Sequence, residues 1–289
     1  MALVFEHVSY TYTPLTKRQI KEGQEPLWAL NDISFEIADG EFLAIAGHTG
    51  SGKSTLVLHL NGVINPTRGK VLWDGQDLAD KKTANEARGD IGVVFQYPEN
   101  QLFAATVYED VAFGPRNLGL DTTEVEQRVK DAIELVELDY ETFKDRSPFE
   151  LSGGQQRRIA FAGVLAMRPT TLVLDEPVAG LDPASRNEFL GFIDRLHKRG
   201  ITLVMVSHNM NDIARLADRM LVLDRGEIAF LGTPEEVFSH PVELREIGLG
   251  VPHAQRMANE LRELGVPLEE GLYSPETLAE HLVALLESR

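Results

Sequence analysis

Short apolar runs dominate the first part of the chain and predict β-strands. Residues 3–5 are apolar, residues 33–37 alternate apolar and polar positions, and residues 42–46 are apolar throughout. Alternation is typical of a strand with one buried face, and a continuous apolar run is typical of a strand buried on both faces. Residues 12–27 are largely polar and contain two prolines, so we expect an extended surface loop or a loose hairpin there.

Farther along, apolar positions with helical spacing alternate with further apolar runs. Residues 123–138 repeat apolar side chains every three or four positions and open with a Thr-x-x-Glu pattern that predicts a capping box. Residues 172–174 and 201–206 are strand-like, and a helix that starts at Asp182 separates them. This alternation predicts an α/β fold in which helices cover a mostly parallel sheet.

The pattern changes near Gly232. Beyond it no strand-like run occurs, prolines interrupt the chain, and helical spacing returns at residues 254–264 and 275–286. We therefore expect one domain over residues 1–232 and a helical appendage over residues 233–289. A leucine stripe in the last helix favours packing on the larger domain, with a partner surface as the alternative. The stripe consists of Leu278, Leu282, Leu285 and Leu286.

Composition and charge exclude several classes of protein. The 289 residues include no cysteine, which excludes a disulfide framework, a thiol nucleophile and a cysteine-ligated metal site. No run approaches the roughly 18 apolar residues that span a bilayer, and the first residues lack the features of a signal peptide. A net charge of −17 disfavours nucleic acid as a partner and disfavours attraction to anionic lipid. A membrane location would therefore require a protein partner.

The clearest chemical motif is Gly47-x4-Gly52-Lys53-Ser54, which lies between a buried strand and a predicted helix. Glycines let backbone N–H groups face phosphate at a helix N-terminus, Lys53 reaches the terminal phosphates, and the Ser54 hydroxyl can bind Mg²⁺. We expect a bound nucleotide here and assign no role to the side chain of His48. The residues expected around the nucleotide are Gly47, His48, Thr49, Gly50, Ser51, Gly52, Lys53, Ser54 and Thr55.

Two acids follow the apolar run 172–174. Successive side chains of a strand point to opposite sides, so Asp175 and Glu176 are expected to have different roles. We assign Asp175 to the Mg²⁺ shell and Glu176 to the polarisation of the attacking water as general base. With Lys53 upstream, this pair predicts hydrolysis of a nucleotide.

Ser152-Gly153-Gly154-Gln155 stands at a second predicted helix start. Its free N–H groups and the Ser152 hydroxyl form a second anion site. A single active site has no evident use for two glycine-rich phosphate contacts, so the surplus indicates that two subunits share each ATP.

In this order and spacing, the motifs of residues 1–232 resemble those of ATP-binding cassette (ABC) ATPases. Residues 179–182 match the D-loop of that family, ending in Asp182, and His208 matches the switch histidine. The resemblance implies a P-loop NTPase fold with an antiparallel N-terminal β subdomain. It also implies a helical subdomain at about residues 97–165, called the signature subdomain because it carries Ser152 to Gln155, the signature motif of the family. It also implies head-to-tail dimerisation.

The same resemblance implies roles for single residues. Gln96 and His208 act in catalysis beside Glu176, and Tyr12 stacks on adenine, with Tyr10 as the alternative. Mg²⁺ is bound by Ser54, Gln96 and Asp175. The ATP of a partner subunit is contacted by Ser152, Gly153, Gly154 and Gln155.

A narrower resemblance follows Gln96. Residues 95–103 and 106–115 are similar to the ATPase subunits of energy-coupling factor (ECF) transporters, including their cobalt and nickel relatives. In that group the helical tail helps to pair two ATPases. Residues 48–51 and 147–150 favour the second ATPase of a heterodimeric pair in vitamin-uptake systems.

These resemblances imply an ATP-hydrolysing subunit that powers micronutrient uptake from the cytoplasmic face of the cell membrane, bound there peripherally. Its partners would be a second ABC ATPase, a transmembrane coupling subunit at residues 96–103 and, indirectly, a substrate-binding membrane subunit. The aromatic residues of 95–103 could line an apolar groove for a helix of the coupling subunit, or they could be core residues. The alternatives are a homodimeric ATPase of a cobalt or nickel importer, a soluble ABC ATPase without a transport role, and a purely structural nucleotide-binding protein.

Overall fold

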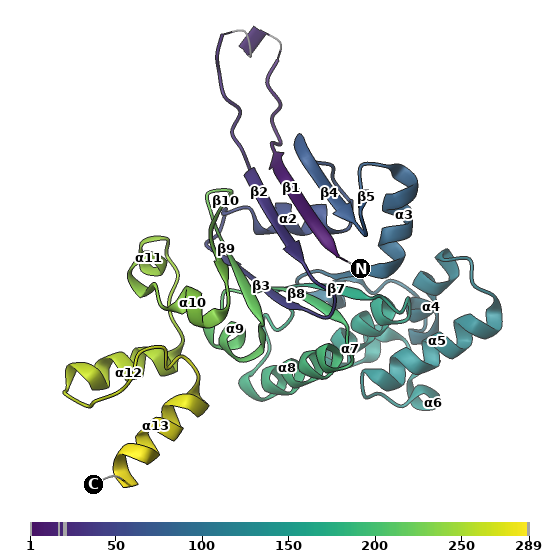
Figure 1. Cartoon of the computed structure of the whole chain (residues 1–289). Coiled ribbons are helices and arrows are strands. Elements are labelled where there is room, and N and C mark those ends of the chain that lie inside the picture. The colour runs from purple at the N-terminus through teal and green to yellow at the C-terminus, as the bar shows by residue number, and fades with distance from the viewer. Residues whose placement is uncertain (1, 17, 20–21, 288–289) are drawn as a thin grey trace.

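The computed structural model describes residues 2–16, 18–19 and 22–287 and contains two β-sheets (Figure 1). The larger sheet has six strands in the order β10-β9-β3-β8-β7-β6. All neighbours in it are parallel except β10 and β9, which form a hairpin. The strands are β3 (Phe42–Gly47), β6 (Ile91–Val94), β7 (Thr171–Asp175), β8 (Thr202–Val206), β9 (Arg219–Asp224) and β10 (Glu227–Gly232). The mostly parallel sheet expected from the sequence is confirmed.

The smaller sheet is antiparallel, with the order β2-β1-β4-β5. Its strands are β1 (Leu3–Tyr10), β2 (Leu30–Ile37), β4 (Arg68–Trp73) and β5 (Gln76–Asp77). The described part of residues 12–27 projects beyond the ends of β1 and β2 (Figure 1). Helix α2 (Lys53–Leu60) and side chains from both sheets share one apolar core, so the antiparallel sheet covers one face of the main sheet.

Alternation along β3 divides its side chains between two cores. Leu43 and Ile45 belong to the core shared with α2 and the smaller sheet, whereas Phe42, Ala44 and Ala46 face helices on the other side. Those helices include α7 (Gly153–Leu165), α8 (Pro183–Lys198) and α9 (Met210–Leu216). Every residue of β3 is buried, which explains why this strand has no polar face in the sequence.

Helices fill the segment between β6 and β7. They are α4 (Val107–Asn117), α5 (Thr122–Leu135), α6 (Tyr140–Phe143) and α7, with short 3₁₀ turns η1 (Pro98–Gln101) and η2 (Pro148–Glu150), and α3 (Lys81–Asp90) precedes β6. Helix α5 corrects one expectation, because its cap is Asp121 and not Thr123. The Asp121 carboxylate accepts hydrogen bonds from the N–H groups of Thr123 and Glu124 at 2.9 and 3.0 Å. Aspartate is a strong cap, so the helix starts one residue before the predicted capping box.

The chain after β10 is helical. It contains α10 (Pro234–Phe238), α11 (Pro241–Glu246), α12 (His253–Glu263) and α13 (Pro275–Glu287). Helices α10 and α11 pack with β9 and α9, whereas α12 and α13 form a separate small core that includes Leu278. Leu286 at the end of α13 is 72% exposed. Figure 1 shows α12 and α13 apart from both sheets. Within the described ranges, no helix has the length and apolarity needed to cross a bilayer.

Candidate functional site

The loop between β3 and α2 is shaped by close backbone approaches. Gly52 adopts φ +108°, and a Cβ atom there would lie 2.6 Å from the carbonyl oxygen of Ala29. A larger residue at position 52 is therefore disfavoured, both by the left-handed backbone and by the contact. Gly52 is also the N-cap of α2 and supplies no side-chain cap, so the first N–H groups of the helix face the loop.

Lys53 curls back over this loop. Its Nζ donates hydrogen bonds to the carbonyl oxygens of Gly47 at 2.7 Å and His48 at 2.8 Å. Burial lowers the pKa of Lys53, and the charges of Glu176 and Asp175 oppose that shift. The ammonium group thus lies between the phosphate loop and the two acids at the end of β7.

Asp175 and Glu176 line the same cavity, so the expectation that they point to opposite sides is wrong. The strand ends at Asp175, and Glu176 has φ +49°, which breaks the alternation of a strand. Burial and then the charge of Glu176 raise the pKa of Asp175, while Lys53 opposes the rise. The turn at Glu176 therefore places two neighbouring carboxylates in one cavity, and Asp175 is the one whose pKa is raised by burial.

Glu176 is held by His208. The Nδ1 of His208 lies 2.7 Å from Oε1 of Glu176, and because the carboxylate can only accept, Nδ1 is the donor. The Glu176 side chain is 16% exposed and that of His208 is 75% exposed. Glu176 is thus an oriented carboxylate, and the histidine reaches it from the loop that follows β8.

These groups surround a cavity of about 420 Å³. Tyr12 lines it with 60% of its surface exposed and its hydroxyl 3.1 Å from Oγ1 of Thr55, whereas Tyr10 is partly buried and packs against the core beside His59. Of the two tyrosines, Tyr12 is therefore the one that lines the cavity. The lining is Tyr12, Ala29, Thr49, Gly50, Gly52, Lys53, Ser54, Thr55, Gln96, Asp175, Glu176 and Val206. Of the residues expected around the nucleotide and in catalysis, Gly47, His48, Ser51 and His208 lie beside this lining and not in it.

The oxygen donors of the cavity fit a magnesium ion. Ser54, Gln96 and Asp175 all line it, and each carries a hard oxygen ligand. Among the described residues, no group of three or more His, Cys, Asp or Glu side chains could hold a metal by itself. Magnesium is commonly bound by one or two protein oxygens together with water and substrate phosphate, so this sparse donor set suits it.

The glycine-rich start of α7 does not line this cavity. Ser152 caps the helix, and Gln155 completes a capping box. Gly153 and Gly154 are exposed, with no atom within 4 Å of where a Cβ would lie. Asp182, the N-cap of α8, is exposed as well. None of these five residues lines the cavity of its own chain, which leaves the N-terminus of α7 open to a ligand held elsewhere.

One support of the phosphate loop was not predicted. Nε2 of His48 lies 3.0 Å from Oδ1 of Asp224, at the end of β9, and Nδ1 lies 2.7 Å from the carbonyl oxygen of Thr49. The next turn of the chain adds a bond from the N–H of Gly226 to the carbonyl oxygen of Ser51 at 3.0 Å. Since Asp224 is 176 residues away from His48, no local sequence signal could reveal the pair.

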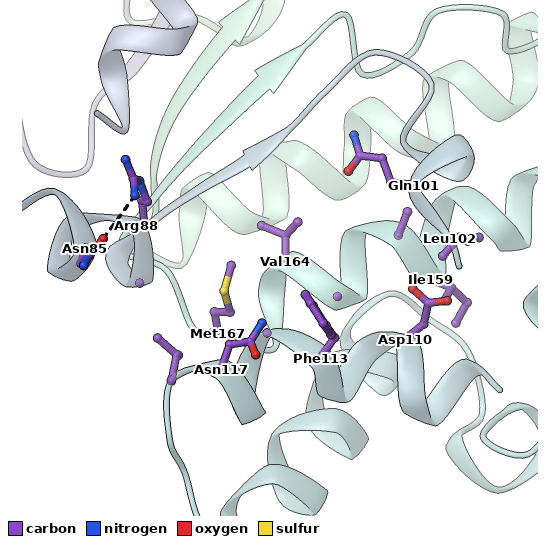
Figure 2. A pocket seen from close by; sticks show the side chains of 15 residues that line it. Asn85, Arg88, Gln101, Leu102, Asp110, Phe113, Asn117, Ile159, Val164 and Met167 are labelled. Carbon is purple, nitrogen blue, oxygen red and sulfur yellow. Dashed lines mark hydrogen bonds between the residues drawn. The ribbon is translucent and has the colours of Figure 1, made fainter. Parts of the chain in front are cut away.

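A second cavity of about 640 Å³ opens between α3, η1, α4 and α7 (Figure 2). Leu102 lines it, whereas Phe95 and Tyr97 do not. Phe113 points into the cavity from α4, and Phe103 packs edge-on against Phe113 at 5.1 Å while 61% exposed. Figure 2 labels Asn85, Arg88, Gln101, Leu102, Asp110, Phe113, Asn117, Ile159, Val164 and Met167 around it. The groove is largely apolar with polar side chains at its margins.

Comparison with known proteins identifies related sequences over nearly the whole chain. A family model described as ABC transporter matches residues 30–179. The chain is 55% identical over 266 residues to the energy-coupling factor transporter ATP-binding protein EcfA2 of Symbiobacterium thermophilum, covering 92% of this chain and 90% of that protein. It is 48% identical over 289 residues to EcfA2 of Clostridium perfringens, covering 99% and 98%.

Solved structures share the fold. CbiO1 of Clostridium perfringens, part of the ABC transporter complex CbiONQ, aligns with a TM-score of 0.73 at 35% identity over 90% of this chain and 98% of its own. The ATP-binding cassette MJ0796, in a dimeric post-hydrolysis state with ADP and phosphate, aligns with a TM-score of 0.68 at 30% identity over 80% of this chain and 98% of its own. The fold of most of this chain is therefore shared with these two proteins.

Proposed function

Since the chain belongs to the ABC transporter ATPase family, among the ATP-binding proteins of energy-coupling factor transporters, we propose that its ATP hydrolysis powers micronutrient uptake through a membrane partner. One observation carries the catalytic part of this proposal. Lys53, Asp175 and Glu176 line one cavity, and His208 orients Glu176 from its edge. A phosphate-binding loop, a metal carboxylate and an oriented base are the parts that nucleotide hydrolysis requires.

Within this site each residue has a distinct task. The N–H groups of the phosphate loop and Lys53 bind the phosphates, and Tyr12 stacks on the adenine. Ser54, Gln96 and Asp175 would hold Mg²⁺, which, when bound, neutralises charge on the transferred phosphoryl group. Glu176 accepts a proton from the attacking water, and His208 keeps that carboxylate pointed into the cavity.

The second phosphate-binding element supports a shared site. Ser152, Gly153, Gly154 and Gln155 form an exposed helix start that does not reach the cavity of their own chain. We infer that they contact the ATP of a second ATPase in a head-to-tail dimer, with Asp182 near the same interface. The ATP-binding cassette MJ0796, which is similar to this chain, was solved in dimeric form with ADP and phosphate bound.

Two further surfaces suit the expected partners. The groove beside Leu102 and Phe113 has the size and apolar character to receive a helix of a transmembrane coupling subunit, which would act between this chain and a substrate-binding membrane subunit. Residues 233–289 would add to the contact between the two ATPases, and exposed Leu286 on α13 is available for it. These contacts would hold the protein peripherally on the cytoplasmic face of the cell membrane.

The second ATPase distinguishes two versions of this function. We favour a heterodimer in a vitamin-type system because identity to EcfA2 proteins reaches 55%, whereas identity to CbiO1 is 35%. The alternative is a homodimer in a cobalt or nickel importer. An affinity pull-down from detergent-solubilised native membranes separates them. Recovery of a second, similar ATPase supports the heterodimer, and recovery of this chain alone with membrane subunits supports the homodimer.

The catalytic assignment is tested with Glu176→Gln in the assembled complex. We expect ATP hydrolysis to fall at least about 100-fold, the usual contribution of a general base, while ATP binding persists. Glu126→Gln, an equal change on the exposed face of α5, serves as the control and should retain full activity. Hydrolysis by Glu176→Gln at the parental rate would reject Glu176 as the base.

A further inference from the structure

Arg157 is a buried cation that belongs neither to the lining of the nucleotide cavity nor to Ser152–Gln155, the residues proposed to contact a partner's ATP. It lies in the second turn of α7, after the glycine-rich start, and its side chain is 4% exposed. Its guanidinium donates to both carboxylate oxygens of Glu99, from Nη2 to Oε1 at 2.8 Å and from Nε to Oε2 at 3.0 Å. Its Nη1 donates to the carbonyl oxygens of Ala179 at 3.0 Å and Pro177 at 3.4 Å. One side chain therefore joins three segments of the chain.

Each of these segments carries groups of the ATP sites. Glu99 stands three residues after Gln96, which lines the nucleotide cavity. Pro177 directly follows Glu176, and Ala179 precedes Asp182 by three residues. Arg157 itself belongs to the helix that begins at Ser152. The guanidinium thus connects the residues beside the chain's own ATP with those that would face the ATP of a partner.

The chemistry of this connection is specific to arginine. A planar guanidinium with five donors can bond a carboxylate in a bidentate manner and still reach two carbonyl oxygens. Lysine would offer a point charge with flexible donors and could not hold all four contacts in one plane. Because the Arg157 side chain is 4% exposed and that of Glu99 is 21% exposed, solvent competes less for these bonds than it does for those of an exposed ion pair.

A second contact joins the same loops. A Cβ built on Gly180 would lie 3.4 Å from the ring of Tyr97, so the residue next to Gln96 packs against the segment that leads to Asp182. Tyr97 has φ +54° and Gly180 has φ +76°, which fixes both loops in left-handed turns at the contact. The two loops meet there independently of Arg157.

We propose that Arg157 is a positioning residue that couples the loop after Gln96, the start of α7 and the loop after Glu176, so that they move as one unit. Nucleotide bound at the phosphate loop then changes the position of Ser152 to Gln155, the element offered to the partner's ATP. This inference rests on the proposed function, since it requires the cavity to bind nucleotide. It assigns to Arg157 a role in communication between the two shared sites and no direct contact with substrate.

Hydrogen–deuterium exchange on the full chain tests the coupling. The nucleotide is AMP-PNP with Mg²⁺, at a protein concentration where light scattering shows a monomer, so that protection of α7 cannot come from a partner. We expect nucleotide to slow exchange at residues 47–56 and also at residues 153–158 and 178–182. In Arg157→Lys the protection at residues 47–56 should persist, and the protection at residues 153–158 should fall at least fivefold.

Two further variants make the result decisive. Glu99→Gln is nearly isosteric and should also lose protection at residues 153–158, which keeps the test valid if Arg157→Lys folds poorly. Arg158→Lys is the matched control. Arg158 bonds Glu137, Glu188 and the carbonyl oxygen of Val136, none of which Arg157 bonds, so its variant should behave as the parent. The inference would be overturned if nucleotide protected residues 153–158 in Arg157→Lys and Glu99→Gln as strongly as in the parent. Absence of protection at residues 47–56 in the parent would instead overturn the nucleotide site on which it rests.

Discussion

Gly52→Ala should damage both the stability of the nucleotide-free protein and its affinity for ATP. At φ +108° the left-handed backbone of an alanine lowers the free energy of unfolding by about 1–2 kcal/mol. Alanine also reduces the conformational entropy of the unfolded chain, which offsets about 0.4–1 kcal/mol of this loss. The new methyl group also meets the carbonyl oxygen of Ala29 at 2.6 Å, and this backbone is fixed by the hydrogen bond from Ala29 N to Tyr10 O at 2.8 Å.

The clash adds a second cost. The loop has to move by about 0.4 Å to bring the contact from 2.6 to 3.0 Å, and overpacking of this kind costs about 1–3 kcal/mol. The total for Gly52→Ala is therefore about 1–5 kcal/mol in the free energy of unfolding. The displaced N–H groups would bond phosphate less well, and we expect at least about a tenfold loss in ATP affinity, equal to about 1.4 kcal/mol.

Gly50→Ala provides the comparison. Gly50 has φ +85° with nothing within 4 Å of a Cβ, so this variant carries the backbone strain without the clash and should lose about 1 kcal/mol. Urea unfolding of the nucleotide-free proteins gives both free energies, and titration calorimetry gives the ATP affinity. Equal destabilisation by the two substitutions would refute the close approach of Gly52 to Ala29 as the reason for this glycine.

Three other expectations follow from the geometry. Phe161→Ala in α7 should lower the unfolding free energy by about 3–5 kcal/mol because the ring is fully buried, whereas Phe149→Ala, 61% exposed, should change it by less than about 0.5 kcal/mol; denaturant titration compares them. Burial lowers the pKa of His59 below its usual 6.5. As pH falls below 6.5, His59 is therefore protonated more readily in the unfolded chain than in the folded protein, and the free energy of unfolding decreases. A His59→Gln variant should lack that part of the acid sensitivity, and identical pH profiles of unfolding would contradict it. For the pair of His48 and Asp224, a double-mutant cycle of alanine variants measured by ATP affinity should give a coupling of about 0.5–1 kcal/mol, and additive effects would remove the support that we assign to the pair.

Much of this protein follows from local sequence rules. The continuous apolar run of residues 42–46 is typical of a strand buried on both faces, and the glycine pattern that follows it predicts a phosphate loop. The helix start at Asp182 depends on one side chain and its neighbours, so the sequence predicts it correctly. At residues 121–126, two possible caps stand close together, and the sequence rule selected the wrong one.

Contacts between distant residues could not be predicted in this way. Glu176 joins Asp175 in one cavity because the chain turns at φ +49°, which a strand pattern does not reveal. The bond from His208 to Glu176, the bond from His48 to Asp224 and the four contacts of Arg157 connect segments between 20 and 176 residues apart. Sequence patterns determine which residues can form a strand, a cap or a phosphate loop, because those depend on neighbours along the chain. The tertiary structure alone decides which acids, bases and buried cations meet, because that depends on how the two sheets and the helices pack.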